Sequence, residues 1–185
     1  PTTSAEDSDQ RHTQLYGETR SDALKSAATA FIDQAVAINE GIEDAANKIN
    51  VGIVSFSSNA AVEDYLTQCE GAAAETLKDS VRRLGANGGT NPSAAMSSAS
   101  SVISGYGSRQ DAKKVVVFFT DGEPDPQGNG YGAVTTAYSM KNADNPAVIY
   151  TIGVFEGANP EDDPTSSSTS RANLLMHAMS SNYPQ

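Results

Sequence analysis

Apolar residues recur at steps of three and four along residues 21–41, which is the spacing of one face of an α-helix. These apolar residues are Leu24, Ala28, Phe31, Ala35 and Ile38. Ser21 stands where an N-cap is expected, and Asp22 follows in the first turn. The pattern predicts a long amphipathic helix that begins at Ser21 and ends near Gly41.

Compact apolar runs alternate with further helical patterns along the rest of the chain. The runs predict strands over residues 51–56, 61–66, 115–119 and 148–154. The helical patterns predict a short polar helix over 42–48 and further helices over 75–84, 92–104, 134–141 and 172–179. Strands separated by helices favour parallel pairing through right-handed crossovers.

The predicted fold class is therefore α/β, with a doubly wound, mostly parallel open sheet and helices on both faces. The pattern opens with a helix that has no strand before it and closes on a loop after a helix. We therefore expect a first, central strand and a last strand to be missing, and the chain to be a piece of a longer polypeptide.

Polar segments mark the expected domain limits. Residues 1–20 lack hydrophobic periodicity and are expected to be a flexible N-terminal segment. Residues 21–185 then form one incomplete domain, which contains a polar, acidic insertion at about 156–170. A chain of 185 residues has the size of one globular domain.

Charge and cysteine content exclude several classes of function. Twelve Lys and Arg against 23 Asp and Glu give a net charge of −11, which makes nucleic acid a poor candidate partner. No apolar run approaches the roughly 20 residues of a membrane-spanning helix. The single Cys69 excludes an internal disulfide framework and a zinc site made of several thiolates.

Two residues in the predicted loops are candidate metal ligands. Asp121 follows the 115–119 strand with one residue between, at the carboxyl edge where ligands of open α/β sheets bind. Thr90 lies in a Gly-rich loop directly before a helix. Each has a structural alternative, because Asp-Gly makes turns and a threonine hydroxyl caps helices. Together they suit an oxygen-only site for Mg²⁺ or Mn²⁺, which needs more ligands than these two.

Other chemistry has less support. His12 and His177 are accompanied by no Gly-x-Ser-x-Gly motif, so a hydrolytic triad is disfavoured and both histidines are expected to be structural or exposed. The acidic run at 161–163 is interpreted as a solvated loop.

The segment after Asp121 imitates two known loops without matching either. A calcium loop that began at Asp121 would need Gly at Pro126 and Glu at Gly132. Gly128, Gly130 and Gly132 do not form a nucleotide-binding Gly-x-Gly-x-x-Gly pattern between a strand and a helix, and are interpreted as a flexible turn.

Over about residues 21–183 the sequence resembles the von Willebrand factor type A domain. The resemblance rests on segments 51–56, 88–92, 115–123 and 148–154. It implies a doubly wound sheet with a metal-ion-dependent adhesion site whose ligands come from an Asp-x-Ser-x-Ser loop after the first strand, a Thr and an Asp. Thr90 and Asp121 match the second and third elements. The first element is absent before Ser21, and the similar spacing at 163–167 is attributed to chance.

Residues 153–160 and 173–184 resemble the A domains of cell-wall-anchored adhesins and pilus-tip proteins of Gram-positive bacteria. This resemblance implies an extracellular adhesion module on the bacterial cell surface, which uses Mg²⁺ or Mn²⁺ to bind an acidic oxygen of a host or matrix ligand and catalyses no reaction. Pilin subunits, or the missing strand of the parent chain, are further expected partners. The alternatives are a structural stalk or assembly domain without a working metal site and, with less support, an α/β hydrolase that uses Asp121.

Overall fold

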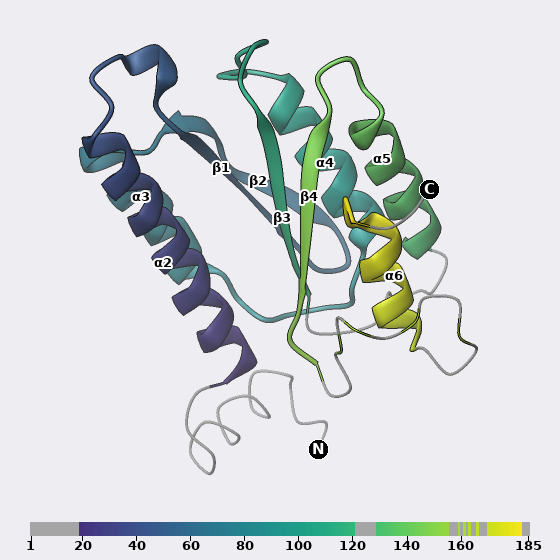
Figure 1. The fold of residues 1–185 in the computed structure, drawn as a ribbon. Coiled ribbons are helices and arrows are strands. Elements are labelled where there is room, and N and C mark those ends of the chain that lie inside the picture. Colours follow the sequence, from purple (N-terminus) through teal and green to yellow (C-terminus); the bar gives the residue numbers. More distant parts are fainter. Residues whose placement is uncertain are drawn as a thin grey trace. The chain divides into compact units, whose positions relative to one another are not determined.

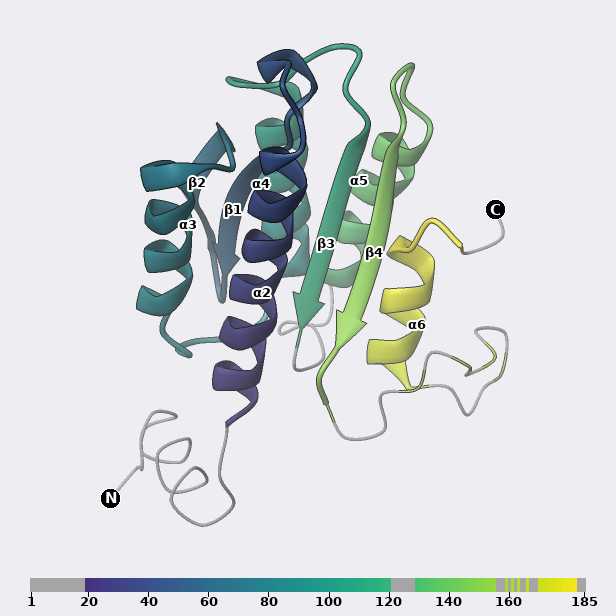
Figure 2. The same cartoon turned by 60° about the vertical axis from the view of Figure 1, so that its left-hand side comes forward.

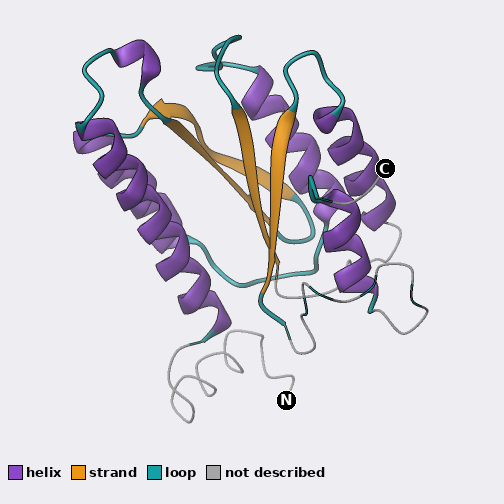
Figure 3. Ribbon diagram, viewed as in Figure 1, coloured by secondary structure: helices purple, strands orange, loops and turns teal. Residues whose placement is uncertain are grey.

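The computed structural model describes residues 19–120, 129–155, 159, 161, 163, 166 and 170–182. In chain order their helices and strands are α2 (Arg20–Glu40), the 3₁₀ helix η1 (Ala45–Asn47), β1 (Asn50–Phe56), β2 (Ala60–Gln68), α3 (Gly71–Arg83), α4 (Pro92–Ser104), β3 (Lys114–Thr120), α5 (Asn129–Lys141), β4 (Ala147–Gly153) and α6 (Arg171–Met179). Helices lie on either side of short strands along the chain, with two consecutive strands, β1 and β2, and two consecutive helices, α3 and α4 (Figures 1 and 3). The predicted α/β class is confirmed.

The described residues divide into two compact units. The first unit comprises the described parts of residues 1–55 and 62–88, and the second comprises those of 56–61 and 89–185. Each unit holds one two-stranded sheet, β1 with β2 or β3 with β4, and no third strand joins either sheet within the described residues. The sequence pattern predicts one open sheet that lacks its central strand, and the presence of two separate strand pairs among the described residues agrees with that expectation. Residues 1–18 of the predicted flexible segment and most of the insertion at 156–170 lie outside the described residues, whereas Thr19 and Arg20 belong to the start of α2 and not to a flexible segment.

In the first unit, helices α2 and α3 pack against the β1–β2 hairpin. The three-residue connection between the strands allows only antiparallel pairing. The core of this unit consists of Ile32, Ala35, Cys69, Ala74, Leu77 and Val81, with Ile49, Val51 and Ile53 packed against it. Lys78 of α3 also reaches Asp33 of α2, with 3.0 Å between Nζ and Oδ1.

Helix α2 differs from its prediction at its start and on its buried face. Thr19 is the N-cap instead of Ser21, because Thr19 and Asp22 form a capping box in which each side chain accepts the other's backbone N–H. The helix buries Ile32, Ala35 and Asn39, whereas Phe31 and Ile38 are 48% and 53% exposed. Sequence periodicity does not decide which of two adjacent apolar residues faces the core.

In the second unit, β3 and β4 pair in parallel from Lys114 opposite Ala147 to Thr120 opposite Gly153 (Figure 2). Helix α5 is the crossover between the two strands. Residues of β3 and β4 share one core with α4, α5 and α6. Its buried members are Ala95, Met96, Val116, Phe118, Ala133, Ala137, Met140, Ala147, Ile149, Leu175, Met176 and Met179.

Helix α5 begins at Asn129, five residues before its predicted start, so the turn expected at Gly130 and Gly132 is wrong. A Cβ added to Gly132 would lie 2.5 Å from Oγ and 3.0 Å from Cβ of Ser93 on α4. Gly132 thus allows α4 and α5 to approach closely, which offsets its low helix propensity. None of the described helices is long and apolar enough to cross a membrane.

Candidate functional site

Of the two predicted metal ligands, Thr90 is described and Asp121 lies outside the described residues. Thr120, the last residue of β3, is buried, and its carbonyl accepts a hydrogen bond from the backbone N–H of Val154 at 2.8 Å. The end of β3 is therefore held against the segment that follows β4.

Thr90 is half-buried in the segment that enters α4. The N-cap of α4 is Asn91, whose Oδ1 accepts the N–H of Ala94 at 3.1 Å, and Pro92 occupies the first helical turn. Thr90 makes no hydrogen bond with another described residue. Of the two roles considered for its hydroxyl, helix capping is therefore wrong, and the oxygen is available as a ligand.

The turn between β1 and β2 holds the residues on both sides of Thr90. The N–H of Gly89 donates to Oγ of Ser58 at 2.9 Å, and the N–H of Asn91 donates to the carbonyl of Ser57 at 2.8 Å. Nδ2 of Asn91 adds a bond to the carbonyl of Ser58 at 3.2 Å. Sequence reasoning missed Ser57 and Ser58, although they lie in a loop directly after the apolar strand 51–56.

The same turn is anchored to β3 by an aromatic pair. The rings of Phe56 and Phe118 stack with centroids 5.1 Å apart and planes inclined by 27°. Phe118 is buried two residues before the end of β3. The hairpin tip, residues 56–59, therefore contacts both the loop that carries Thr90 and the strand that leads to Asp121.

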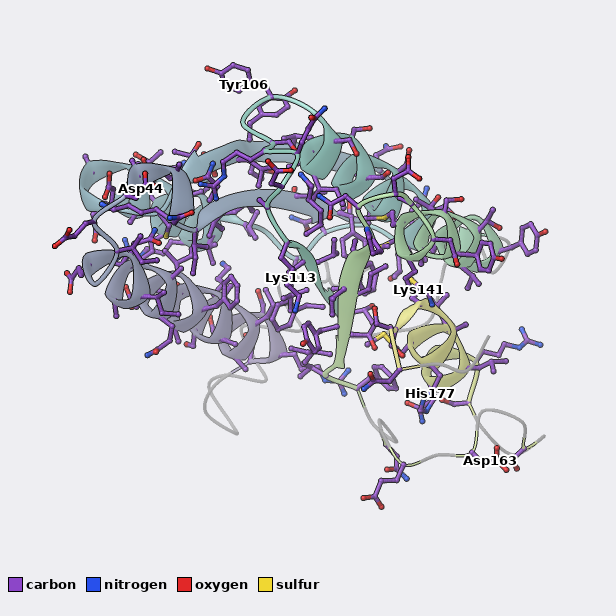
Figure 4. All side chains as sticks on the ribbon, turned by 45° about the horizontal axis from the view of Figure 1, so that its top comes forward. Asp44, Tyr106, Lys113, Lys141, Asp163 and His177 are labelled. Carbon is purple, nitrogen blue, oxygen red and sulfur yellow. The ribbon has the colours of Figure 1, made fainter. Side chains whose placement is uncertain are left out.

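The remaining candidates do not converge on a second site. His177 lies on α6 (Figure 4), and its carbonyl accepts the hydroxyl of Ser180 at 2.9 Å. Glu161 and Asp163 are exposed, as expected of a solvated loop. His12, Thr165 and Ser167 lie outside the described residues, as do Glu123, Asp125, Pro126 and Gly128.

Lys141 contacts the C-terminal end of α6 and stabilises it (Figure 4). Its Nζ donates to the carbonyls of Ala178 at 3.2 Å and Ser180 at 2.8 Å, which the helix terminus would otherwise leave without a partner. Burial lowers the pKa of Lys141 below its ordinary value.

The described residues fit a hard divalent cation only in part. The Thr90 hydroxyl, which bonds to no other described residue, is an oxygen ligand of the kind that Mg²⁺ and Mn²⁺ accept. Nowhere in the described ranges do three His, Cys, Asp or Glu side chains gather as a metal site. A complete site therefore requires further oxygen ligands, of which Asp121 is the predicted one.

Comparisons with known proteins bear on this geometry. A family model for the von Willebrand factor type A domain matches residues 5–123. Similar solved structures include a von Willebrand factor type A protein from Catenulispora acidiphila, which is 20% identical with a TM-score of 0.61 over 90% of this chain and 34% of that one. Proximal thread matrix protein 1 from the mussel byssus is 16% identical with a TM-score of 0.61 over 94% of this chain and 38% of that one.

A third similar structure is the manganese-loaded TRAP protein of Plasmodium vivax, which is 17% identical with a TM-score of 0.48 over 80% of this chain and 64% of that one. A search of curated proteins found no match. The chain spans less than two fifths of the length of the first two structures, at 34% and 38%. At such low identity these two structures establish the likeness of fold.

Proposed function

Because the chain belongs to the von Willebrand factor type A domain family, we propose that it is a binding module that holds Mg²⁺ or Mn²⁺ through Thr90 and Asp121. The matched region, residues 5–123, includes both ligands. The observation that carries the proposal is the cap of α4. Asn91 takes this role, and the hydroxyl of Thr90 is left without a partner among the described residues.

The bound ion would supply the attraction for a partner. Hard cations with few protein ligands keep water molecules that an incoming oxygen can replace. On a chain of net charge −11, a cation also gives an acidic group a local site of opposite charge. The partner is therefore a protein with an accessible carboxylate, and we expect no catalysed reaction.

The setting that we propose is the surface of a Gram-positive bacterium. Residues 153–160 and 173–184 support it through their resemblance to A domains of cell-wall-anchored adhesins and pilus-tip proteins. A buried lone Cys69 that forms no disulfide is compatible with such exported proteins. In this setting the partner is a host or matrix protein, with pilin subunits as further neighbours.

The test is Mn²⁺ binding by the full chain, followed by electron paramagnetic resonance of the free ion. We expect Thr90→Ala and Asp121→Ala each to weaken binding by tenfold or more, in the range of about 10 to 100-fold known for residues around metal sites. Thr135→Ala is the control, because its exposed hydroxyl donates to the Tyr131 carbonyl of its own helix. Unchanged binding by Asp121→Ala would show that the proposed site is wrong.

A structural stalk or assembly domain is the second candidate. It is supported by the free edge of β3, with which no described strand pairs, and by exposed apolar residues of this sheet such as Val115 and Ile152. Parallel sheets are normally covered on both faces, so a further strand from the parent chain or another subunit is the proposed partner. A melting temperature that Mn²⁺ does not raise above its value in EDTA would favour this candidate, because an ion that binds the folded state must raise it.

A further inference from the structure

The hairpin tip, residues 56–59, is connected to both segments that carry the candidate ligands. Ser57 and Ser58 hold Gly89 and Asn91 through three hydrogen bonds of 2.8 to 3.2 Å. Phe56 stacks on Phe118 of β3, whose last residue, Thr120, directly precedes Asp121. One short turn therefore contacts the Thr90 loop on one side and the strand before Asp121 on the other.

These contacts restrict the positions that the hydroxyl of Thr90 can adopt. The bond to the N–H of Asn91 restrains the peptide unit directly after Thr90, and the bond to the N–H of Gly89 restrains the backbone one residue before it. With the flanking backbone restrained, the position of the hydroxyl depends mainly on one side-chain torsion, which has three staggered states. A ligand oxygen must lie within about 0.5 Å of its productive position, so such restraint is what a metal site requires.

The division of the chain into two units groups the tip with the same segments. Strand residues 50–55 and 62–68 belong to the first unit, whereas residues 56–61 between them belong to the second, together with Thr90 and β3. The tip therefore belongs to the same compact unit as the Thr90 loop and β3.

We infer that Ser58 is a positioning residue for the metal site, and that the hairpin tip sets the separation between the Thr90 loop and the end of β3. This inference rests on the proposed function. The hydroxyl of Ser58 is the only side-chain group among the described residues of the tip that bonds to the Thr90 loop, since Ser57 contributes only its carbonyl. Ser58 acts through Thr90 and need not contact the ion.

The experiment compares Ser58→Ala, Ser58→Thr and Asn59→Ala in the full chain. Ser58 and Asn59 are both exposed, so none of these substitutions opens a cavity. The first measurement is hydrogen exchange at the Gly89 amide, which reports the bond directly and needs no metal. Ser58→Ala should raise this exchange rate about tenfold, as expected when a bond of roughly 1.4 kcal/mol is lost. Ser58→Thr keeps the hydroxyl and Asn59→Ala keeps the bond, so both should exchange like the original chain.

The second measurement is Mn²⁺ affinity, because a role confined to loop structure would not change it. We expect Ser58→Ala to weaken Mn²⁺ binding about tenfold, within the range of about 10 to 100-fold for residues that orient metal ligands. Ser58→Thr should restore the affinity, and Asn59→Ala should leave it unchanged.

The results distinguish the proposed metal site from the proposed positioning role of Ser58. If Thr90→Ala weakens Mn²⁺ binding and Ser58→Ala does not, the metal site stands and the positioning role is wrong. If the original chain binds no Mn²⁺, the proposed function is wrong and the positioning role falls with it. Loss of affinity in Ser58→Ala with restoration in Ser58→Thr supports both.

Discussion

The side chain of Asn39 and the backbone of Ile49 hydrogen-bond in both directions. Oδ1 of Asn39 accepts the N–H of Ile49 at 2.6 Å, and its Nδ2 donates to the carbonyl of Ile49 at 3.0 Å. Nδ2 also donates to the carbonyl of Cys69 at 2.9 Å. One buried amide thus joins the end of α2 to the residue before β1 and the residue after β2.

Asn39→Ala should lower the free energy of unfolding by about 2 to 3 kcal/mol, because it leaves buried backbone groups without partners. The measurement is urea denaturation followed by circular dichroism. Asn47→Ala is the matched control, since Nδ2 of Asn47 makes one exposed bond to Asp44 at 3.4 Å. That control should change stability by less than about 0.5 kcal/mol. Equal effects of the two substitutions would contradict a special role for Asn39.

Cys69 should make stability fall in alkaline solution. Burial raises the pKa of its thiol above the ordinary 9.0, and Sγ donates to the carbonyl of Ile32 at 3.6 Å. The folded chain therefore holds this proton more tightly than the unfolded chain does. Its contribution to stability is complete below pH 9.0 and is lost as the pH rises through the raised pKa.

Urea denaturation at several pH values from about 8 to 11 would test this, and Cys69→Ala should flatten the decline. Thiol labelling of the folded chain should also be slow until the first unit opens, because Cys69 is 0% exposed. Rapid labelling without denaturant would contradict the described burial.

Lys141→Met should loosen the end of α6 while keeping most of the apolar stem of the side chain. Two carbonyls of the helix terminus lose their charged donor, so we expect hydrogen exchange at the Ser180 amide to speed up about tenfold. Lys113→Met is the control, because Lys113 is exposed (Figure 4). The prediction fails if both variants exchange alike at Ser180.

Gly132→Ala should destabilise the chain by about 1 to 3 kcal/mol, the usual cost of overpacking, because the new methyl group would clash with Ser93. On an isolated helix the same change would be stabilising. Adding Ser93→Ala removes the Oγ contact at 2.5 Å and should recover part of the loss, whereas the Cβ contact at 3.0 Å persists. Thermal melts of the two single variants and the double variant measure this coupling.

Local sequence signals predicted the elements well where they were strong and agreed with one another. Pro92 in the first turn after a Gly-rich loop located α4, and the apolar run 115–119 located β3. Predictions were wrong where contacts between residues far apart in the sequence determine which residue is buried or where a helix begins. Ile32 is buried instead of Phe31 because of packing with α3 and β1, and Gly132 lies within α5, where the absence of a side chain leaves room for Ser93.

The sequence identified part of the candidate site. The position of Thr90 before a helix identified the loop, but only the structure shows that Asn91 supplies the cap. Ser58 could not be found from spacing, because the bond to Gly89 joins residues 31 positions apart. Asp121 stays a prediction.

The assignment of residues 56–61 to the second unit makes that unit discontinuous along the chain. A polypeptide cut between Gly88 and Gly89 would give a C-terminal fragment without Phe56, the ring partner of Phe118. During synthesis, by contrast, the hairpin emerges from the ribosome before β3 does. The partner for Phe118 is then already available when β3 appears, so the order of translation favours assembly of this core, and splitting the gene at residue 88 would yield halves that are not self-sufficient.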